Sequence, residues 1–155
     1  MDSERRRALR ACGGLLAALA AAGFVPPALA QSGAGAWNAA AFGAADLDAA
    51  LTVLGAAGSV ESPDIRIEAP EVSDTGGTVP VAVTSDIPGT DAIALLVDKN
   101  PTALSAVIEV PAGTDPWVNL NLRMAESGNV VALVRATGRY YHARRGVKLV
   151  QGGCE

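Results

Sequence analysis

The sequence predicts an all-β protein, an antiparallel β-sandwich with a short N-terminal helix and a flexible C-terminal arm. After residue 63, apolar residues recur in short runs, most of them with a period of two. Turn-forming Gly, Pro, Asn and Asp residues separate these runs. These runs predict seven to eight short strands, and only one segment of the chain shows a helical period. This combination is typical of a β-sandwich.

The helix is predicted at residues 46–55. Asp46 is suited to cap its N-terminus, and Gly55 is a natural stop. One face carries three leucines: Leu47, Leu51 and Leu54. We therefore expect residues 31–63 to form a loose Gly/Ala-rich leader with this helix, followed from residue 56 by a linker.

The sandwich domain is predicted to span residues 64–150. Its strands are expected at residues 65–69, 79–83, 92–97, 106–110, 117–122, 129–135, 139–143 and 147–150. The continuous apolar run at 92–97 indicates a strand covered on both faces. Thr137-Gly138 is typical of a hairpin turn.

The first thirty residues are predicted to be an export signal. A basic start precedes an apolar stretch, and Ala28-Leu29-Ala30 offers small residues to a signal peptidase. Arg5-Arg6-Arg7-Ala8-Leu9-Arg10 resembles a twin-arginine motif, which would place the protein in the periplasm. An ordinary secretory signal and an uncleaved anchor are the alternatives. Glycines and prolines interrupt the stretch and argue against the anchor.

The charge balance restricts the partners. Removing the signal leaves 125 of the 155 residues, with 8 of the 12 bases, 14 of the 16 acids and a net charge of −6. This length suits a single domain with its own core. The acidic balance argues against nucleic acid or an anionic membrane as partner.

The remaining bases gather late in the chain, since six of the eight follow residue 120. Three lie close to the C-terminus: Arg144, Arg145 and Lys148. They either belong to solvated strand faces or recruit an anionic ligand or an acidic partner surface.

Cys154 is the only cysteine after the signal, so no internal disulfide can form. Gly152 and Gly153 precede it and lack the Cβ atoms that restrict backbone rotation. We expect residues 151–155 to form a flexible arm that reaches about 16 Å when extended. Such a thiol suits either intermolecular pairing or a reactive role.

Other chemistry fits this composition poorly. Cys154, His142 and Met124 are too few for a blue-copper or structural zinc site, so we expect no metal. A thiol on a diglycine tether cannot be held against a base, which argues against a cysteine hydrolase. A covalent carrier remains, with no cofactor beyond an adduct on Cys154. The alternative is a secreted interaction subunit whose Cys154 only forms an intermolecular disulfide.

Several segments resemble one family, SoxY, the sulfur-substrate carrier of the periplasmic thiosulfate-oxidising Sox system. They are 64–70 (DIRIEAP), 84–90 (TSDIPGT), 97–101 (VDKNP), 111–114 (PAGT) and 147–154 (VKLVQGGC). The resemblance covers essentially all of the chain after the signal.

The resemblance implies an immunoglobulin-like sandwich that forms a heterodimer with a SoxZ-like subunit. It implies that Cys154 carries thiosulfate-derived sulfur, which a SoxAX-type haem protein loads oxidatively. A SoxB-type hydrolase would then remove sulfate, and in some organisms a sulfur dehydrogenase would oxidise the remaining sulfane. In this scheme the chain is a carrier and not an enzyme.

The chain departs from the family pattern at its end. The family tail runs close to Gly-Gly-Cys-Gly-Gly, whereas Glu155 follows Cys154 here. The added carboxylates should raise the pKa of the Cys154 thiol and repel a negatively charged adduct. We therefore expect slower loading or an altered choice of partner.

Overall fold

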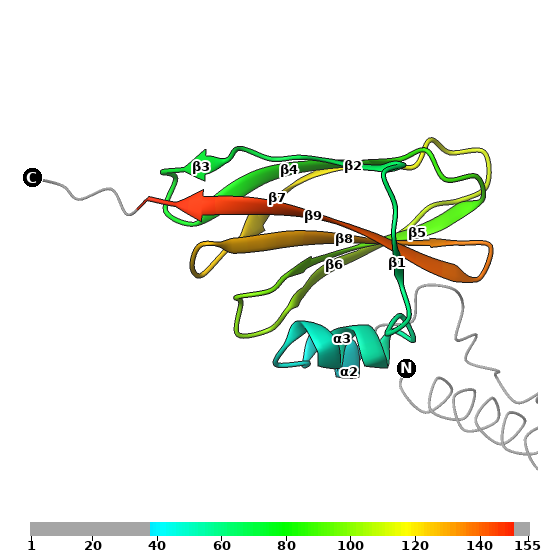
Figure 1. The fold of residues 1–155 in the computed structure, drawn as a ribbon, viewed down its shortest axis with the longest axis horizontal. Helices are drawn as coiled ribbons and strands as arrows, with labels where there is room; N and C mark the ends of the chain where they lie inside the picture. Colours follow the sequence, from blue (N-terminus) through cyan, green and yellow to red (C-terminus); the bar gives the residue numbers. More distant parts are fainter. Residues whose placement is uncertain (1–37, 151–155) are drawn as a thin grey trace, which may run out of the picture. The chain divides into compact units, whose positions relative to one another are not determined.

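The computed structural model describes residues 38–150, in which two β-sheets pack face to face (Figure 1). The larger sheet contains β1 (Val60–Glu61), β3 (Val72–Ser73), β5 (Thr90–Val97), β6 (Leu104–Glu109), β8 (Gly128–Ala136) and β9 (Arg139–Leu149). The smaller sheet contains β2 (Ile65–Glu68), β4 (Thr78–Ser85) and β7 (Trp117–Arg123). The predicted all-β sandwich is confirmed.

The strand order follows from hairpin pairing. The larger sheet runs β1-β9-β8-β5-β6, with β3 also paired to β9, and the smaller sheet runs β2-β4-β7. The main hairpin, β8–β9, turns at Thr137 and Gly138, whose φ angles are 49° and 76°. Two successive positive φ angles are those of a type I′ turn, so the predicted hairpin is confirmed.

The core lies between the two sheets. Inward-facing residues of β4, β5 and β8 are fully or nearly fully buried there: Val79, Val81, Val83, Ile93, Leu95, Val97, Val130, Ala132 and Val134. The other face of β5, with Ala94 and Leu96, packs in a second apolar cluster that includes helical residues. This confirms the prediction that residues 92–97 are covered on both sides.

Two helices contribute to this second cluster, α2 (Ala39–Phe42) and α3 (Leu47–Val53). Asp46 caps α3 by accepting a 2.7 Å hydrogen bond from the Ala49 N–H, as predicted. Helix α2 falls in the segment predicted as a loose leader, so that prediction was wrong for residues 39–42. The Asn38 side chain caps α2, and Ala41 is completely buried.

Strand boundaries differ from the prediction at three places. The predicted linker contains β1, β3 lies between the strands expected at 65–69 and 79–83, and β9 is continuous where two strands were expected. Strands β1 and β3 have two residues each and pair with β9 in parallel. A segment of two residues is too short to show the alternation that predicts a strand. Its strand conformation depends on pairing with β9, which is distant in the sequence. Within residues 38–150 no helix has the length and apolarity that crossing a membrane requires.

Candidate functional site

Backbone hydrogen bonds hold the end of β9 beside β3, and the carbonyl groups of β3 and of the residue two before its end accept them. The Lys148 N–H donates to the Glu71 carbonyl, and the Val150 N–H donates to the Ser73 carbonyl, each at 2.9 Å. Figure 1 shows β3 beside this end of β9. The strand is therefore anchored up to the last residue that the structure describes.

A side chain holds the same strand end through the β7–β8 connection. The Ser127 hydroxyl accepts from the Leu149 N–H at 2.9 Å and lies 3.4 Å from the Leu149 carbonyl oxygen, to which it donates. Gly152, Gly153 and Cys154 lie outside the described residues, as does Glu155. Their predicted roles as tether and sulfur attachment site stay predictions, but the point from which they extend is well anchored.

A hollow of about 460 Å³ lies at this strand end. It is lined by Gly76, Gly77, Met124, Ala125, Glu126, Ser127, Leu149 and Val150. Glu126 is the one charged residue of this lining, and Met124 is almost completely buried. Cys154 is the fourth residue after Val150, and an extended chain of that length spans about 13 Å, so the hollow lies within reach of the thiol.

The three basic residues predicted to recruit an anion are not brought together. Side chains alternate along a strand, so Arg144 and Lys148 share one face of β9 and Arg145 points to the other. Arg144 and Lys148 are exposed and form no ion pair within residues 38–150. Because no acidic side chain among the described residues neutralises them, these two side chains are free to attract an anion.

Arg145 is engaged at the edge of the sandwich. Its guanidinium lies 3.4 Å from the Glu71 carboxylate, and its side chain lines a hollow with Ile67 and Pro70. Its Nε atom is buried and has no hydrogen-bond partner among the described atoms. Arg145 therefore spans the gap between the sheets, an arrangement that the sequence pattern did not indicate.

His142 is half-buried, in agreement with its predicted position in a strand. Its Nδ1 atom lies 3.0 Å from the Ser59 hydroxyl. In the part of the chain that the structure describes, no three His, Cys, Asp or Glu side chains gather as a metal site would require. The contact with Ser59 ties β9 to the segment that follows α3.

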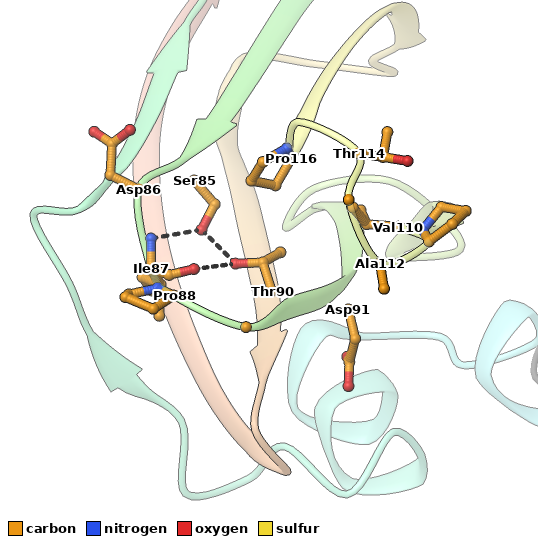
Figure 2. A pocket seen from close by; sticks show the side chains of 13 residues that line it. Ser85, Asp86, Ile87, Pro88, Thr90, Asp91, Val110, Ala112, Thr114 and Pro116 are labelled. Carbon is orange, nitrogen blue, oxygen red and sulfur yellow. Dashed lines mark hydrogen bonds between the residues drawn. The ribbon is translucent and has the colours of Figure 1, made fainter.

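A second hollow, of about 520 Å³, lies between the β4–β5 turn and the β6–β7 connection (Figure 2). Its hydroxyl groups bond to one another: Ser85 and Thr90 are 2.9 Å apart, and Thr90 donates to the Ile87 carbonyl at 2.8 Å. The Thr137 N–H at the start of the β8–β9 hairpin donates to Gly89 in this turn. The hollow therefore lies at the Arg139 end of β9, about 33 Å along the strand from Leu149.

An ion cluster that sequence reasoning missed lies next to this hollow. The Arg135 guanidinium contacts the Asp91 carboxylate at 2.5 Å and the Glu109 carboxylate at 3.1 Å. The hydrogen bond to Asp91 is the main cause that raises the pKa of Arg135 above its ordinary value, against an opposing effect of burial. Asp91 lies where the register between β5 and β8 shifts, between Thr90 and Ala92, so the ion cluster stabilises β5 at this irregular point.

Comparison with known proteins identifies relatives. The family model described as "Sulfur oxidation protein SoxY" matches residues 50–154. The solved structure of the sulfur carrier protein SoxY from Chlorobium limicola f thiosulfatophilum is 38% identical, with 70% of this chain and 95% of that chain covered and a TM-score of 0.62.

A superoxide reductase (neelaredoxin) from Ignicoccus hospitalis is 20% identical, with 58% of this chain and 82% of that chain covered and a TM-score of 0.50. That likeness shows the fold alone. No curated protein sequence gives a significant match.

Proposed function

The chain belongs to the SoxY family of sulfur oxidation proteins, and we propose that it carries thiosulfate-derived sulfur covalently on Cys154. Membership confirms the resemblance seen in the sequence and the expectation of a carrier instead of an enzyme. The observation that supports Cys154 is its position four residues beyond an anchored strand end, at the last residue of the family match.

The proposed loading step joins the Cys154 sulfur to the outer sulfur of thiosulfate. Forming this bond from a thiolate and thiosulfate releases two electrons, which a haem protein of the SoxAX type would accept. Hydrolysis of the resulting S-thiosulfonate by a SoxB-type enzyme would consume one water and release sulfate and two protons. Cys154 would then keep a persulfide, which a sulfur dehydrogenase would oxidise in organisms that have one.

Two features of the strand end suit this role. The anchored end of β9 gives the arm a defined origin, so partner enzymes can meet the sulfur at a predictable distance. The mainly apolar hollow at the same end lies within reach of an adduct and could hold it away from bulk water. Exposed Arg144 and Lys148 would favour the approach of anionic thiosulfate or an acidic partner.

The protein is proposed to work in the periplasm, exported by the twin-arginine-like signal in residues 1–30, and to form a heterodimer with a SoxZ-like subunit. Fusing residues 1–30 to a reporter that acts only after export tests the signal. Replacing Arg5 and Arg6 by Lys should abolish export by the twin-arginine route, whereas continued export would show that an ordinary secretory signal operates.

Intact mass spectrometry tests the carrier role. The purified protein is incubated with thiosulfate and the haem-containing loading enzyme, and is weighed before and after reduction. We expect one thiosulfate-derived adduct on the wild type, its loss on reduction, and no adduct on Cys154→Ser. A disulfide-linked dimer with no sulfur adduct under any condition would instead favour the interaction-subunit alternative.

The same assay tests Glu155, the residue that follows Cys154. Replacing Glu155 by Gly-Gly removes its side-chain charge, and Glu155→Gln serves as a control that keeps its size. Faster loading of both variants would indicate charge repulsion, and faster loading of the Gly-Gly variant alone would indicate a steric effect. No loading of the wild type beside normal loading of the Gly-Gly variant would show that this tail is not used as it stands.

A further inference from the structure

Strand β7 forms an unprotected edge of the smaller sheet. It pairs with β4 over seven residues in unbroken register, and no other described strand pairs with it. From Trp117 to Leu122 it contains no charged residue and no proline. Proteins commonly protect edge strands with charges, prolines or bulges, because unpaired backbone groups otherwise recruit another strand.

The direction of the β7 backbone groups follows from two hydrogen bonds at its ends. The Ser85 N–H donates to the Pro116 carbonyl at 3.0 Å, and the Met124 N–H donates to the Gly77 carbonyl at 2.7 Å. Even-numbered residues therefore direct their backbone groups toward β4. The odd-numbered residues direct theirs to the free edge: Trp117, Asn119, Asn121 and Arg123.

Two of the groups on this free edge already have partners. The Trp117 N–H donates to the Asp115 carbonyl at 2.8 Å, and the Arg123 carbonyl accepts from the Asn100 side-chain amide at 2.7 Å. Among the described residues, the other groups have no partner. They are the Trp117 carbonyl, the N–H and carbonyl of Asn119 and of Asn121, and the Arg123 N–H.

We propose that β7 pairs in antiparallel fashion with β7 of a second copy of this chain, about a two-fold axis at Leu120. In this register Asn119 lies opposite Asn121 of the second copy and exchanges two hydrogen bonds with it. Trp117 lies opposite Arg123 of the second copy, whose N–H donates to the free Trp117 carbonyl.

This register satisfies every free group, because the two groups that are already bonded fall opposite each other. The Trp117 N–H and the Arg123 carbonyl would have formed the second bond of their pair, and neither needs it. A shift of two residues in either direction places a bonded group opposite a free one. The pattern of capped and free groups therefore selects one register and one symmetric partner.

The side chains complement one another in the same register. Trp117 is 59% exposed and would receive the guanidinium of Arg123 from the second copy, as in a cation–π pair. Asn119 and Asn121 would face each other as two amides. On the inner face, half-buried Val118 and Leu120 would gain apolar neighbours and lose contact with water.

The edge strand of the larger sheet, β6, is less suited to such pairing. Its register with β5 shifts between Leu95 and Leu96, and its final residue, Glu109, is engaged with Arg135. The proposal for β7 does not depend on Cys154, so it stands apart from the carrier role.

Sedimentation velocity over a range of concentrations tests the proposal on the purified Cys154→Ser protein, in which no disulfide can form. We expect a reversible dimer. The double variant Asn119→Lys, Asn121→Lys places like charges opposite each other and should weaken dimerisation roughly tenfold or more. The matched variant Asn119→Lys, Asn121→Glu places opposite charges together and should dimerise at least as well as the parent.

Amide hydrogen exchange locates the contact. The Asn119, Asn121 and Arg123 amides should become protected as the concentration rises, and should lose this protection in the Lys/Lys variant. Both variants alter exposed side chains, and circular dichroism checks that they fold. A monomer at every concentration, or equal dimerisation of the two variants, would overturn the proposal. Protection that arises only when a different β-rich protein is added would also overturn it and would assign the edge to that protein.

Discussion

The backbone N–H of Val150 donates a 2.9 Å hydrogen bond to the carbonyl oxygen of Ser73. This bond joins the last described residue before the predicted arm to β3, a two-residue strand that lies more than seventy residues earlier in the sequence. The arm therefore begins at a point held by tertiary contacts, and the reach of Cys154 is measured from there.

Removing the Ser127 hydroxyl should loosen this strand end. Ser127→Ala deletes the hydrogen bonds to the Leu149 N–H and carbonyl, so we expect a loss of about 1 kcal/mol in the free energy of unfolding and faster exchange of the Leu149 amide. Urea denaturation and hydrogen exchange measure both. Ser105→Ala is the control, because the Ser105 hydroxyl has no hydrogen-bond partner among residues 38–150. Equal effects of the two substitutions would show that Ser127 does not anchor the strand.

Gly77 should tolerate no side chain. Its φ of +85° lies in the left-handed region, and an added Cβ would stand 2.5 Å from the Met124 carbonyl oxygen. We expect Gly77→Ala to destabilise the protein by more than about 2 kcal/mol, since backbone strain and steric overlap act together. Gly76→Ala is the control: its φ is +64°, but an added Cβ there meets nothing within 4 Å. If urea denaturation gives the two variants equal stability, the overlap with Met124 does not matter.

Arg135→Lys should weaken the cluster that fastens the break in β5. A lysine cannot reach both carboxylates with the planar geometry of a guanidinium. Because Asp91 and Glu109 are partly exposed to solvent, we expect a loss of only about 1 kcal/mol. Arg139→Lys, at an exposed residue with no ion pair among those described, should change thermal stability far less.

The pH dependence of this cluster follows from the raised pKa of Arg135. A group whose pKa is higher in the folded state contributes stability that is complete below its unfolded pKa and is lost only as the pH rises through the folded value. Arginine titrates far above neutrality, so the Arg135 charge should contribute no slope to stability between neutral and moderately alkaline pH. Subtracting the Arg135→Lys stability curve from that of the wild type tests this, and a clear slope would contradict it.

Substitutions of the basic residues of β9 should affect either sulfur loading or protein stability, depending on the residue. Arg144→Ser and Lys148→Ser should slow the loading of thiosulfate, most strongly at low salt, and leave stability nearly unchanged. Arg145→Ser should instead lower stability, because the side chain fills the gap beside Ile67 and Pro70. Loading kinetics at two ionic strengths, with thermal melts of each variant, distinguish the effects. Slower loading caused by Arg145→Ser alone would reverse this assignment.

Much of the fold was predictable because local patterns and tertiary structure agree. The alternation in β4, the continuous apolar run of β5 and the Thr137-Gly138 turn each indicated the element that forms. The cap at Asp46 did the same for α3. Each of these signals lies within a few residues of the element that it specifies.

The signals that failed were those that depend on distant partners. Helix α2 forms where its buried alanine packs, and β1 and β3 exist only because β9 accepts them. Arg145, which the charge pattern grouped with Arg144 and Lys148, is separated from them by strand alternation and bonded to Glu71. The ion cluster of Arg135, Asp91 and Glu109 joins three strands. No local sequence pattern predicts it, because its members lie far apart in the sequence.

Residue identity and spacing establish which chemistry is available: a single cysteine after the predicted signal, a diglycine before it and an acidic chain with few metal ligands. These are properties of residue identity and spacing, which need no folding to be read. The anchoring of the β9 end, the ion pair of Arg145 and the open edge at β7 become visible in the folded protein alone, because each depends on strand pairings between residues far apart in the chain.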